Sequence, residues 1–237
     1  MHNTSLSVVI TAYNEESNVA ECLNLMHDFL KQNVRDFEIL FVNDGSTDNT
    51  GNEARKLGLS HLHIIDQKVN RGTGAGVKEA LKIARCEFYC WFPCDLEIMP
   101  HELRHPLEAL ADNDIVITHF TNGDSVRTKF RHCLSIIFVK ILNLSFLNSI
   151  RYFNGVSLMR VNLLKPEKVK ANGFFFHAEL LLKTLQSTHK YVQVPIKLTP
   201  RKRELPKAIR LTVLLDVIAC YFRILWEVKL RNENSHY

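Results

Sequence analysis

The first hundred residues alternate between short β-rich runs and segments whose apolar residues have helical spacing. Residues 6–11 are mostly apolar or β-branched, and residues 19–31 then carry an apolar residue at every third or fourth position. The alternation recurs and predicts further strands and helices: strands at 37–42, 62–66 and 88–92, and helices at 48–57 and 74–85. Strands that alternate with helices favour parallel crossover connections, so we expect an α/β fold built on a doubly wound sheet.

Beyond residue 113 the alternation is less regular. We expect three further strands and two further helices: strands at 114–118, 152–159 and 191–198, and helices at 127–147 and 177–186. A single domain is expected over residues 1–207, with no linker or internal repeat.

The last apolar segment, residues 208–231, is predicted to be an amphipathic helix within an appendage over residues 208–237. Asp216 and Arg223 interrupt its apolar residues, so it lacks the span of about 20 apolar residues that crosses a bilayer. We expect this helix to lie on a membrane surface. The alternatives are that it packs on its own domain or forms a dimer interface.

Ligands of open parallel sheets bind beyond the carboxyl ends of the strands. Four loops follow predicted strands at that edge: residues 12–16, 43–48, 69–74 and 93–97. We therefore expect these loops to meet at one crevice that holds the chemistry of the protein.

Composition predicts a folded protein that works in the cytoplasm. The 237 residues are 46% apolar, which is enough for a full core. Residues 1–6 show no basic stretch followed by an apolar run, so no secretory signal is expected. The six cysteines have no paired spacing and are expected to be reduced; Cys86, Cys90 and Cys94 are interpreted as core residues of a buried strand.

The net charge of +5 is unevenly distributed. Residues 125–166 contain no Asp or Glu but seven Lys or Arg, interleaved with apolar runs such as residues 136–139. This pattern favours an anionic partner with an apolar part, such as a phospholipid surface or a lipid phosphate. Nucleic acid is not expected, because the apolar runs separate the basic residues and no nucleic-acid motif is present.

Four motifs at the predicted strand ends carry a family resemblance. They are TAYNEE at 11–16, VNDGSTD at 42–48, NRGTG at 70–74 and CDLE at 94–97. In this order they resemble the family-2 glycosyltransferases, and in particular the branch of the dolichyl- and polyprenyl-phosphate mannose synthases. Residues 151–159, 173–179 and 194–207 are also similar to that branch. The resemblance implies a GT-A fold, which is a Rossmann-like, nucleotide-sugar-binding α/β fold.

A nucleotide diphosphate-sugar needs hydrogen-bond acceptors for its base and ribose and a counter-charge for its two phosphates. Asp44 lies on an Asp-Gly-Ser turn and is expected to accept from the base or ribose, although the same turn could be an ordinary helix N-cap. The resemblance implies further residues at the nucleotide-sugar: Thr11, Tyr13, Glu15, Gly72 and Cys94.

The expected metal site departs from the family pattern of two acids separated by one residue. Pro93 stands at the first position, but Glu97 provides a second carboxylate one residue beyond Asp95. Mg²⁺ or Mn²⁺ prefers such oxygen ligands and takes others from diphosphate and water. We expect a divalent cation at Asp95 and Glu97. The alternative is that both acids cap the helix that begins near His101.

A phosphate acceptor is already an anion near neutral pH, so it needs no general base, whereas a hydroxyl acceptor does. The resemblance implies that Arg131 and Ser135, one turn apart on a helix, hold the acceptor phosphate, with Arg127 as a further cation. His119 stands where the branch has another arginine after the fifth strand.

We therefore expect an inverting glycosyltransferase that moves a sugar from a nucleotide diphosphate-sugar to a polyprenyl phosphate. The expected catalytic residues are Asp95 with Arg201 and Lys207, which match the family's mobile Arg and Lys at the diphosphate. One alternative is transfer to a glycan or small-molecule hydroxyl with Glu179 as base. Another is a binding protein without turnover, which Pro93 favours. We expect peripheral attachment to the cytoplasmic face of a membrane; a membrane-protein partner and a homo-oligomer both stay open.

Overall fold

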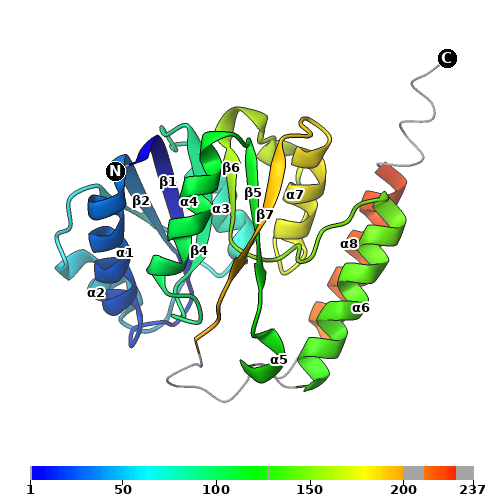
Figure 1. Cartoon of the computed structure of the whole chain (residues 1–237). Coiled ribbons are helices and arrows are strands. Elements are labelled where there is room, and N and C mark those ends of the chain that lie inside the picture. Colours follow the sequence, from blue (N-terminus) through cyan, green and yellow to red (C-terminus); the bar gives the residue numbers. More distant parts are fainter. Residues whose placement is uncertain (1, 127–128, 200–210, 228–237) are drawn as a thin grey trace.

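The computed structural model describes residues 2–126, 129–199 and 211–227, and within them a seven-stranded sheet forms the centre of the molecule (Figure 1). The strand order is β3-β2-β1-β4-β6-β5-β7. The strands have the following bounds: β1 His2–Ala12, β2 Val34–Asn43, β3 Leu62–Asp66, β4 Phe88–Pro93, β5 Ile115–Phe120, β6 Ser157–Arg160 and β7 Tyr191–Ile196.

The predicted doubly wound α/β sheet is confirmed, with one strand reversed. β1 to β4 pair in parallel, as do β5 and β7, whereas β6 is antiparallel to both of its neighbours. β6 is also shorter than the predicted strand 152–159. Gly155, just before β6, lies close to β5, because a Cβ atom there would lie 2.8 Å from the carbonyl oxygen of Thr118.

Helices cover both faces of the sheet (Figure 1). Their bounds are α1 Val19–Asn33, α2 Thr50–Lys56, α3 Thr73–Leu81, α4 Arg104–Glu108, α5 Gly123–Val126, α6 Lys129–Phe146, α7 Phe176–Leu185 and α8 Leu211–Leu225. Short 3₁₀ segments lie at Pro100–Leu103, Ala109–Ala111, Val161–Leu163 and Pro166–Lys168.

The core is divided in two by the sheet. Successive residues of a strand point to opposite faces. Val8 therefore packs in the cluster that contains Met26 of α1, and Val9 packs in the cluster that contains Val77 of α3 and Leu181 of α7. This alternation explains why the strand runs are apolar throughout, as expected for a sheet that is covered on both sides.

The helices α6 and α8 lie side by side at one end of the sheet (Figure 1). The hydroxyls of Ser145 and Tyr221 are 2.7 Å apart, and Leu142, Cys220 and Ile224 are buried in the second core cluster. The described part of α8 thus packs on its own domain, whereas residues 208–210 and 228–231 of the predicted helix lie outside the described residues. In the part of the chain that is described, no helix combines the length and apolar character needed to span a bilayer.

The cysteines agree with the expectation of reduced thiols. All six are free, and Cys86, Cys90 and Cys94 are buried. Cys90 and Cys94 belong to the core cluster on the α1 side of the sheet, so they fill space between the sheet and its helices.

Candidate active site

The carboxyl ends of the first strands meet at one edge of the sheet, as the sequence predicts. The amide of Asn14 donates to Ser46 Oγ at 3.0 Å, and the amide of Glu15 donates to Thr50 Oγ1 at 2.8 Å. These bonds join the loop after β1 to the turn after β2. Pro93, the last residue of β4, pairs with Thr11 of β1. The four motifs therefore converge although they are distant in sequence.

Asp44 holds the loop of residues 69–74, which we call the glycine loop. Its buried carboxylate accepts hydrogen bonds from the amide of Arg71 at 2.8 Å and from the amide of Gly72 at 2.9 Å. The sequence predicts that Asp44 accepts from a base or ribose. In this structure both oxygens bind the chain itself, so the observed role of Asp44 is to fix the glycine loop.

The glycine loop is packed closely on both sides. Gly45 has a φ of +67°, and a Cβ atom there would lie 2.3 Å from the carbonyl carbon of Val69. Gly72 has a φ of +88°, and a Cβ atom there would lie 2.6 Å from the carbonyl oxygen of Asn172. Only glycine combines these dihedral angles with such close approach of backbone.

Two aromatic residues that the sequence does not single out lie beside the predicted nucleotide-sugar residues. Trp91 Nε1 donates to Thr11 Oγ1 at 3.0 Å, so the buried Thr11 hydroxyl is engaged by the protein. The Trp91 ring lies 4.1 Å from the ring of His177, the second residue of α7. Tyr13, by contrast, is 41% exposed. The sequence spacing of Trp91 and His177 does not predict this ring contact, because only the tertiary fold brings β4 and α7 together.

A small cavity separates these rings from β6. Tyr89, Trp91, Ser157 and His177 are among its lining residues. The hydroxyl of Tyr89 and Nε2 of His177 are buried without a hydrogen-bond partner. Burial lowers the pKa of His177 to about 3, so its imidazole is neutral at physiological pH.

The acidic motif leaves β4 through a tight turn. Leu96 has a φ of +57°, which is uncommon for a leucine, and Asp95 Oδ1 accepts from the amide of Glu97 at 3.1 Å. The carbonyl of Glu97 accepts from the amide of Thr199 at 2.7 Å. Asp95 therefore stabilises its own turn. The 3₁₀ segment that starts at Pro100 has Met99 at its N-cap and no side-chain capping hydrogen bond, so the structure does not support the alternative that both acids cap this helix.

The carboxylates of this turn provide oxygen ligands, which is the ligand type that a hard divalent cation prefers. Asp95 and Glu97 are both partly exposed. A hydrogen bond with Cys22 and burial raise the pKa of Cys94 well above its usual value, and the charges of Glu15 and Asp95 add to the rise. Glu15 and Asp95 thus both lie close enough to Cys94 for their charges to act on its thiol. Among the described residues no three His, Cys, Asp or Glu side chains form a metal-binding group, so two carboxylates would need substrate phosphates and water to complete a Mg²⁺ or Mn²⁺ site.

The residues predicted to bind the acceptor phosphate (Arg127, Arg131 and Ser135) and the diphosphate (Arg201 and Lys207) are only partly described. Arg127, Arg201 and Lys207 lie outside the described residues, and so does the side chain of Arg131. Ser135 is half-buried on α6.

An arginine does reach the end of β5, but from another loop. Arg151, which precedes β6, lies with Nη1 3.1 Å from Nε2 of His119. A guanidinium can only donate, so Nε2 of His119 accepts and its Nδ1 carries the proton. Burial and the charge of Arg151 lower the pKa of His119. His119, which stands where the resembling branch has an arginine, therefore lies next to Arg151.

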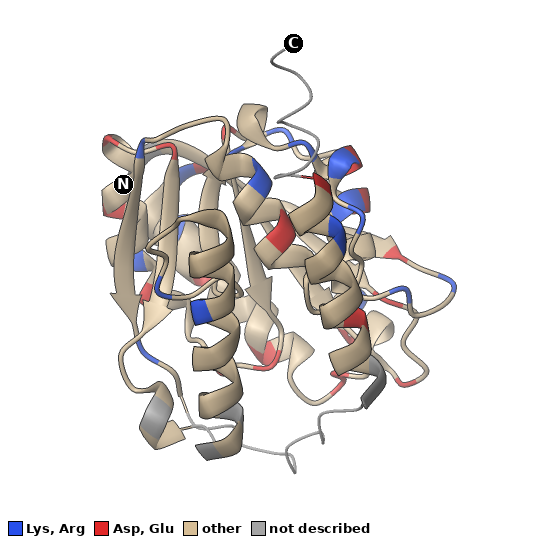
Figure 2. Ribbon diagram, turned by 90° about the vertical axis from the view of Figure 1, so that its right-hand side faces the viewer, with Lys and Arg blue, Asp and Glu red and all other residues tan. Residues whose placement is uncertain are grey.

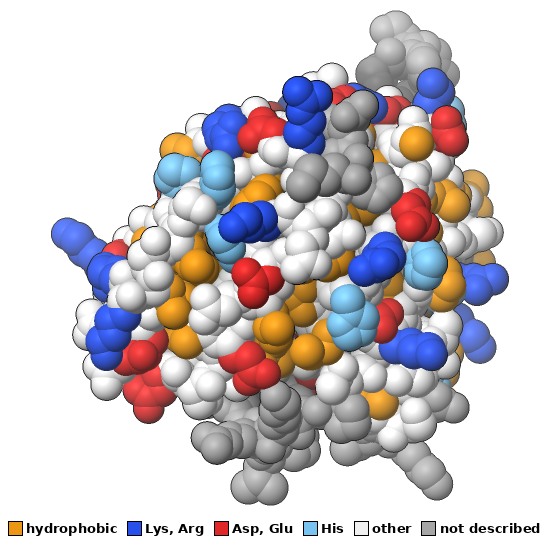
Figure 3. All heavy atoms as spheres, turned by 60° about the vertical axis from the view of Figure 1, so that its left-hand side comes forward, with side chains coloured by type: hydrophobic (Ala, Val, Ile, Leu, Met, Phe, Trp, Pro, Cys, Tyr) orange, Lys and Arg blue, Asp and Glu red, His pale blue; other side chains and the backbone are white. Residues whose placement is uncertain are grey.

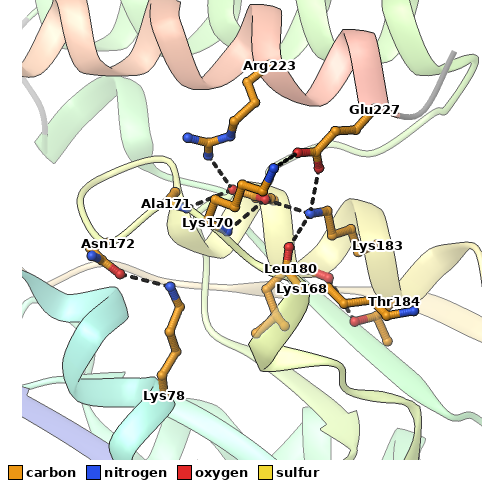
Figure 4. Close-up of polar contacts among 11 residues, drawn as sticks. Lys78, Lys168, Lys170, Ala171, Asn172, Leu180, Lys183, Thr184, Arg223 and Glu227 are labelled. Carbon is orange, nitrogen blue, oxygen red and sulfur yellow. Dashed lines mark hydrogen bonds and ion pairs between the residues drawn. The ribbon is translucent and has the colours of Figure 1, made fainter. Parts of the chain in front are cut away.

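Glu179 does not have the environment of a general base. It is fully buried, and each of its oxygens accepts two hydrogen bonds: Oε1 from the Lys170 amide and Lys183 Nζ, and Oε2 from the Ala171 amide and Arg223 Nη2 (Figure 4). Burial favours the neutral form, but the bond from Lys183 and the two amides outweigh it, and the pKa of Glu179 is lowered. A carboxylate that accepts four protein donors and has no exposure cannot reach a substrate proton. The base role predicted for Glu179 therefore does not fit the structure.

The close packing of the glycine loop predicts a large cost for a methyl group at Gly45. Gly58 is a matched control, because it also has a positive φ but meets nothing within 4 Å of an added Cβ. We expect Gly58→Ala to lower the free energy of unfolding by about 1 kcal/mol, the cost of a left-handed conformation. Gly45→Ala should cost about 2 kcal/mol more, because backbone must move. Urea unfolding measures both, and equal losses would show that the turn and the glycine loop are not closely packed.

Known proteins resemble this chain in sequence. The profile of Glycosyl transferase family 2 matches residues 7–166. A dolichyl-phosphate beta-glucosyltransferase of Saccharomyces cerevisiae is 25% identical over 223 residues, which cover 81% of this chain and 66% of that protein. An uncharacterized glycosyltransferase of Rickettsia conorii is 28% identical over 168 residues, which cover 67% of this chain and 27% of that protein. The chain thus spans less than two thirds of the length of these relatives.

Solved structures resemble the fold. The glucosyl-3-phosphoglycerate synthase of Mycobacterium tuberculosis, crystallised with Mn²⁺, uridine-diphosphate-glucose and phosphoglyceric acid, superposes with a TM-score of 0.70. The match covers 94% of this chain and 80% of that one at 19% sequence identity, a level that supports the fold alone. Since the family profile covers more than half of the 237 residues and the sheet matches a GT-A enzyme, the chain belongs to glycosyl transferase family 2.

Proposed function

We propose that this protein is an inverting glycosyltransferase that transfers a sugar from a nucleotide diphosphate-sugar to a polyprenyl phosphate. The observation that carries the choice of acceptor is the burial of Glu179, the acid that a hydroxyl acceptor would need as base. A phosphate acceptor needs no base. The similarity to a dolichyl-phosphate beta-glucosyltransferase over 81% of the chain supports the same choice.

The reaction places simple demands on the site. An oxygen of the acceptor phosphate attacks the anomeric carbon, a new carbon–oxygen bond forms, and the bond from that carbon to the diphosphate oxygen breaks with inversion. No proton has to be removed from the acceptor. We assign the donor to the edge formed by Tyr13, the glycine loop and the Asp95 turn. A divalent cation held by Asp95 and Glu97 would supply counter-charge to the leaving diphosphate.

Cations on the other side of this edge would meet the acceptor. Arg151 is exposed at the end of β5, and the neutral His119 accepts one of its hydrogen bonds and so orients the guanidinium. Arg151 is therefore a candidate for the phosphate contact that the resemblance assigns to an arginine after the fifth strand. Arg127, Arg131 and Ser135 stay proposed for the same phosphate, and Arg201 and Lys207 for the diphosphate.

The experiment that tests this function pairs two acceptors that differ only in the phosphate. Purified protein is offered labelled nucleotide-sugars, including uridine-diphosphate-glucose and guanosine-diphosphate-mannose, with a short polyprenyl phosphate or with the corresponding polyprenol. We expect one donor to label the polyprenyl phosphate and none to label the polyprenol, and we expect a chelator of divalent cations to abolish the product. Equal labelling of polyprenol would contradict a phosphate acceptor, and full activity with chelator would remove the metal from the mechanism.

Substitution of the acidic turn tests the assigned cation ligands. Asp95→Ala should lower turnover by about 100-fold or more, because a ligand is lost from the cation that would stabilise the leaving diphosphate. Glu97→Gln should be milder, since an amide oxygen still coordinates. Asp112→Ala, at an exposed acid, is the matched control and should leave turnover unchanged. If thermal unfolding of the Asp95 variant is normal and its turnover is too, the site is assigned wrongly.

We also propose that α6 and α8 face a membrane. Their outer residues are large, apolar and exposed: Phe130, Ile137 and Leu144 of α6, Phe222 of α8 and Trp226 directly after α8 are 48% to 80% exposed. In Figure 2 the ribbons of both helices are mostly tan, with few positions coloured as Lys, Arg, Asp or Glu, whereas Lys, Arg, Asp, Glu and His side chains are interspersed in the view of Figure 3. An apolar face of this kind marks an interaction surface. The basic and apolar sequence of α6, which contains Lys140 and no acid, favours an anionic lipid surface.

Flotation with vesicles of anionic phospholipid checks this surface. Leu144→Gln on α6 and Phe222→Gln on α8 should each lower the fraction of protein that floats several-fold, because each removes apolar area from the lipid contact. Ile83→Gln is the matched control, since Ile83 is 54% exposed but lies after α3. Equal flotation of all three variants would show that α6 and α8 do not contact the lipid.

A further inference from the structure

A charged cluster joins α8 to α7 (Figure 4). At its centre, the buried carboxylate of Glu179 accepts from Lys183 Nζ at 2.8 Å and from Arg223 Nη2 at 2.9 Å. Glu227 extends the cluster and lies 2.6 Å from Lys170 Nζ and 3.1 Å from Lys183 Nζ. Arg223 and Glu227 both come from the C-terminal part of the chain, so the cluster depends on the docking of α8.

The same carboxylate fixes the backbone of the segment that precedes α7. Residues 169–175, which we call the bridging segment, contain no helix or strand. Glu179 accepts from the amides of Lys170 and Ala171, each at 3.0 Å. Gly173 lies against α8, because a Cβ atom there would be 3.1 Å from Oδ2 of Asp216. The position of the bridging segment is thus set by Glu179 on one side and by α8 on the other.

The bridging segment in turn supports the glycine loop. The carbonyl of Asn172 accepts from the amide of Gly74 at 2.8 Å and lies against Gly72, where no Cβ atom fits. Oδ1 of Asn172 accepts from Lys78 Nζ at 2.8 Å (Figure 4). Asn172 follows directly after the two residues whose amides Glu179 holds. The glycine loop is therefore clamped between the Asp44 carboxylate and the Asn172 carbonyl.

We propose that Glu179 is a positioning residue of the donor site, which acts through the bridging segment to hold the glycine loop, and that α8 completes this clamp through Arg223. The proposal rests on the proposed function in that it takes the glycine loop to bind the nucleotide diphosphate-sugar. It goes beyond that function because it links the donor loop to the helix that is proposed to face a membrane.

The physical basis is the cost of an unpaired buried charge. Glu179 keeps its charge without solvent because two cations and two amides compensate it. Loss of Arg223 leaves Oε2 with one donor, and a buried pair that loses a partner is strongly destabilised. We expect the bridging segment to move, because it has no helix or sheet hydrogen bonds and its displacement costs the least free energy. Such movement withdraws the Asn172 carbonyl from Gly72 and Gly74.

Hydrogen exchange measured on the full chain without ligand tests the clamp directly. The variants are Glu179→Gln and Arg223→Gln, with Arg223→Lys as the conservative replacement. Lys82→Gln is the control, because it removes an exposed ion pair with Glu79 next to α3. We expect amide exchange of residues 69–77 to rise about fivefold or more in the first two variants and to stay near wild type in Arg223→Lys and Lys82→Gln. Exchange of α1 and β2 should not change.

Unchanged exchange of residues 69–77 in Arg223→Gln would overturn the proposal. A rise of similar size in α1 and β2 would overturn it too, because Glu179 and Arg223 would then stabilise the whole fold rather than the glycine loop.

A second readout separates the clamp from the proposed function. Calorimetric titration with uridine diphosphate and with guanosine diphosphate, each with Mn²⁺, measures the donor site. We expect the nucleotide that binds wild type to bind Glu179→Gln and Arg223→Gln about fivefold more weakly, and Lys82→Gln equally well. If wild type binds neither nucleotide, the proposed function fails while the exchange result still decides the clamp. Equal affinity in wild type and both variants would overturn the positioning role.

Discussion

A buried carboxylate must be compensated by hydrogen bonds and cations, and this requirement organises the edge of the sheet at which the carboxyl ends of the strands meet. Asp44 and Glu179 are both buried. In each, both carboxylate oxygens accept hydrogen bonds from backbone amides of a loop that lacks regular structure. Asp44 holds the glycine loop from the side of β2. Glu179 holds the bridging segment, whose carbonyl at Asn172 meets the glycine loop from the side of α7. The buried carboxylates of Asp44 and Glu179 therefore fix the backbone of the glycine loop and of the bridging segment.

The sheet provides the frame on which these loops meet. Parallel strands bring the ends of β1, β2 and β4 to one edge, and the reversed strand β6 begins at that same edge and carries the loop with Arg151 to the end of β5. The side chains at this edge divide into two kinds. Tyr13, Asp95 and Glu97 are at least partly exposed, whereas Thr11, Asp44 and Glu179 are buried.

The chemistry that this edge can support follows from that division. It offers oxygen ligands for a cation and an exposed arginine, but the acid proposed as base is enclosed by four donors. The proposed transfer of a sugar from a diphosphate to a phosphate acceptor is consistent with such a site, because that transfer needs no general base. Gly173 of the bridging segment lies against α8, so the proposed clamp connects the glycine loop to a helix that is proposed to face a membrane.

The sequence by itself determined the class of fold and the place of the chemistry. Continuous apolar, β-rich runs in β1 and β2 and the helical spacing in α1 identify the elements, because each strand is covered on both faces and each helix on one. The motifs at 11–16, 42–48, 70–74 and 94–97 follow strands that must end together. What only the tertiary structure decided was which side chains remain available. Glu179 and Asp44 resemble ligand residues in sequence, but their partners are backbone amides and the distant Arg223, and no local pattern encodes such contacts. The burial and the hydrogen-bond partners of a carboxylate depend on the whole packed chain. Its exposure, and therefore its possible role, is decided only when the helices pack on the sheet.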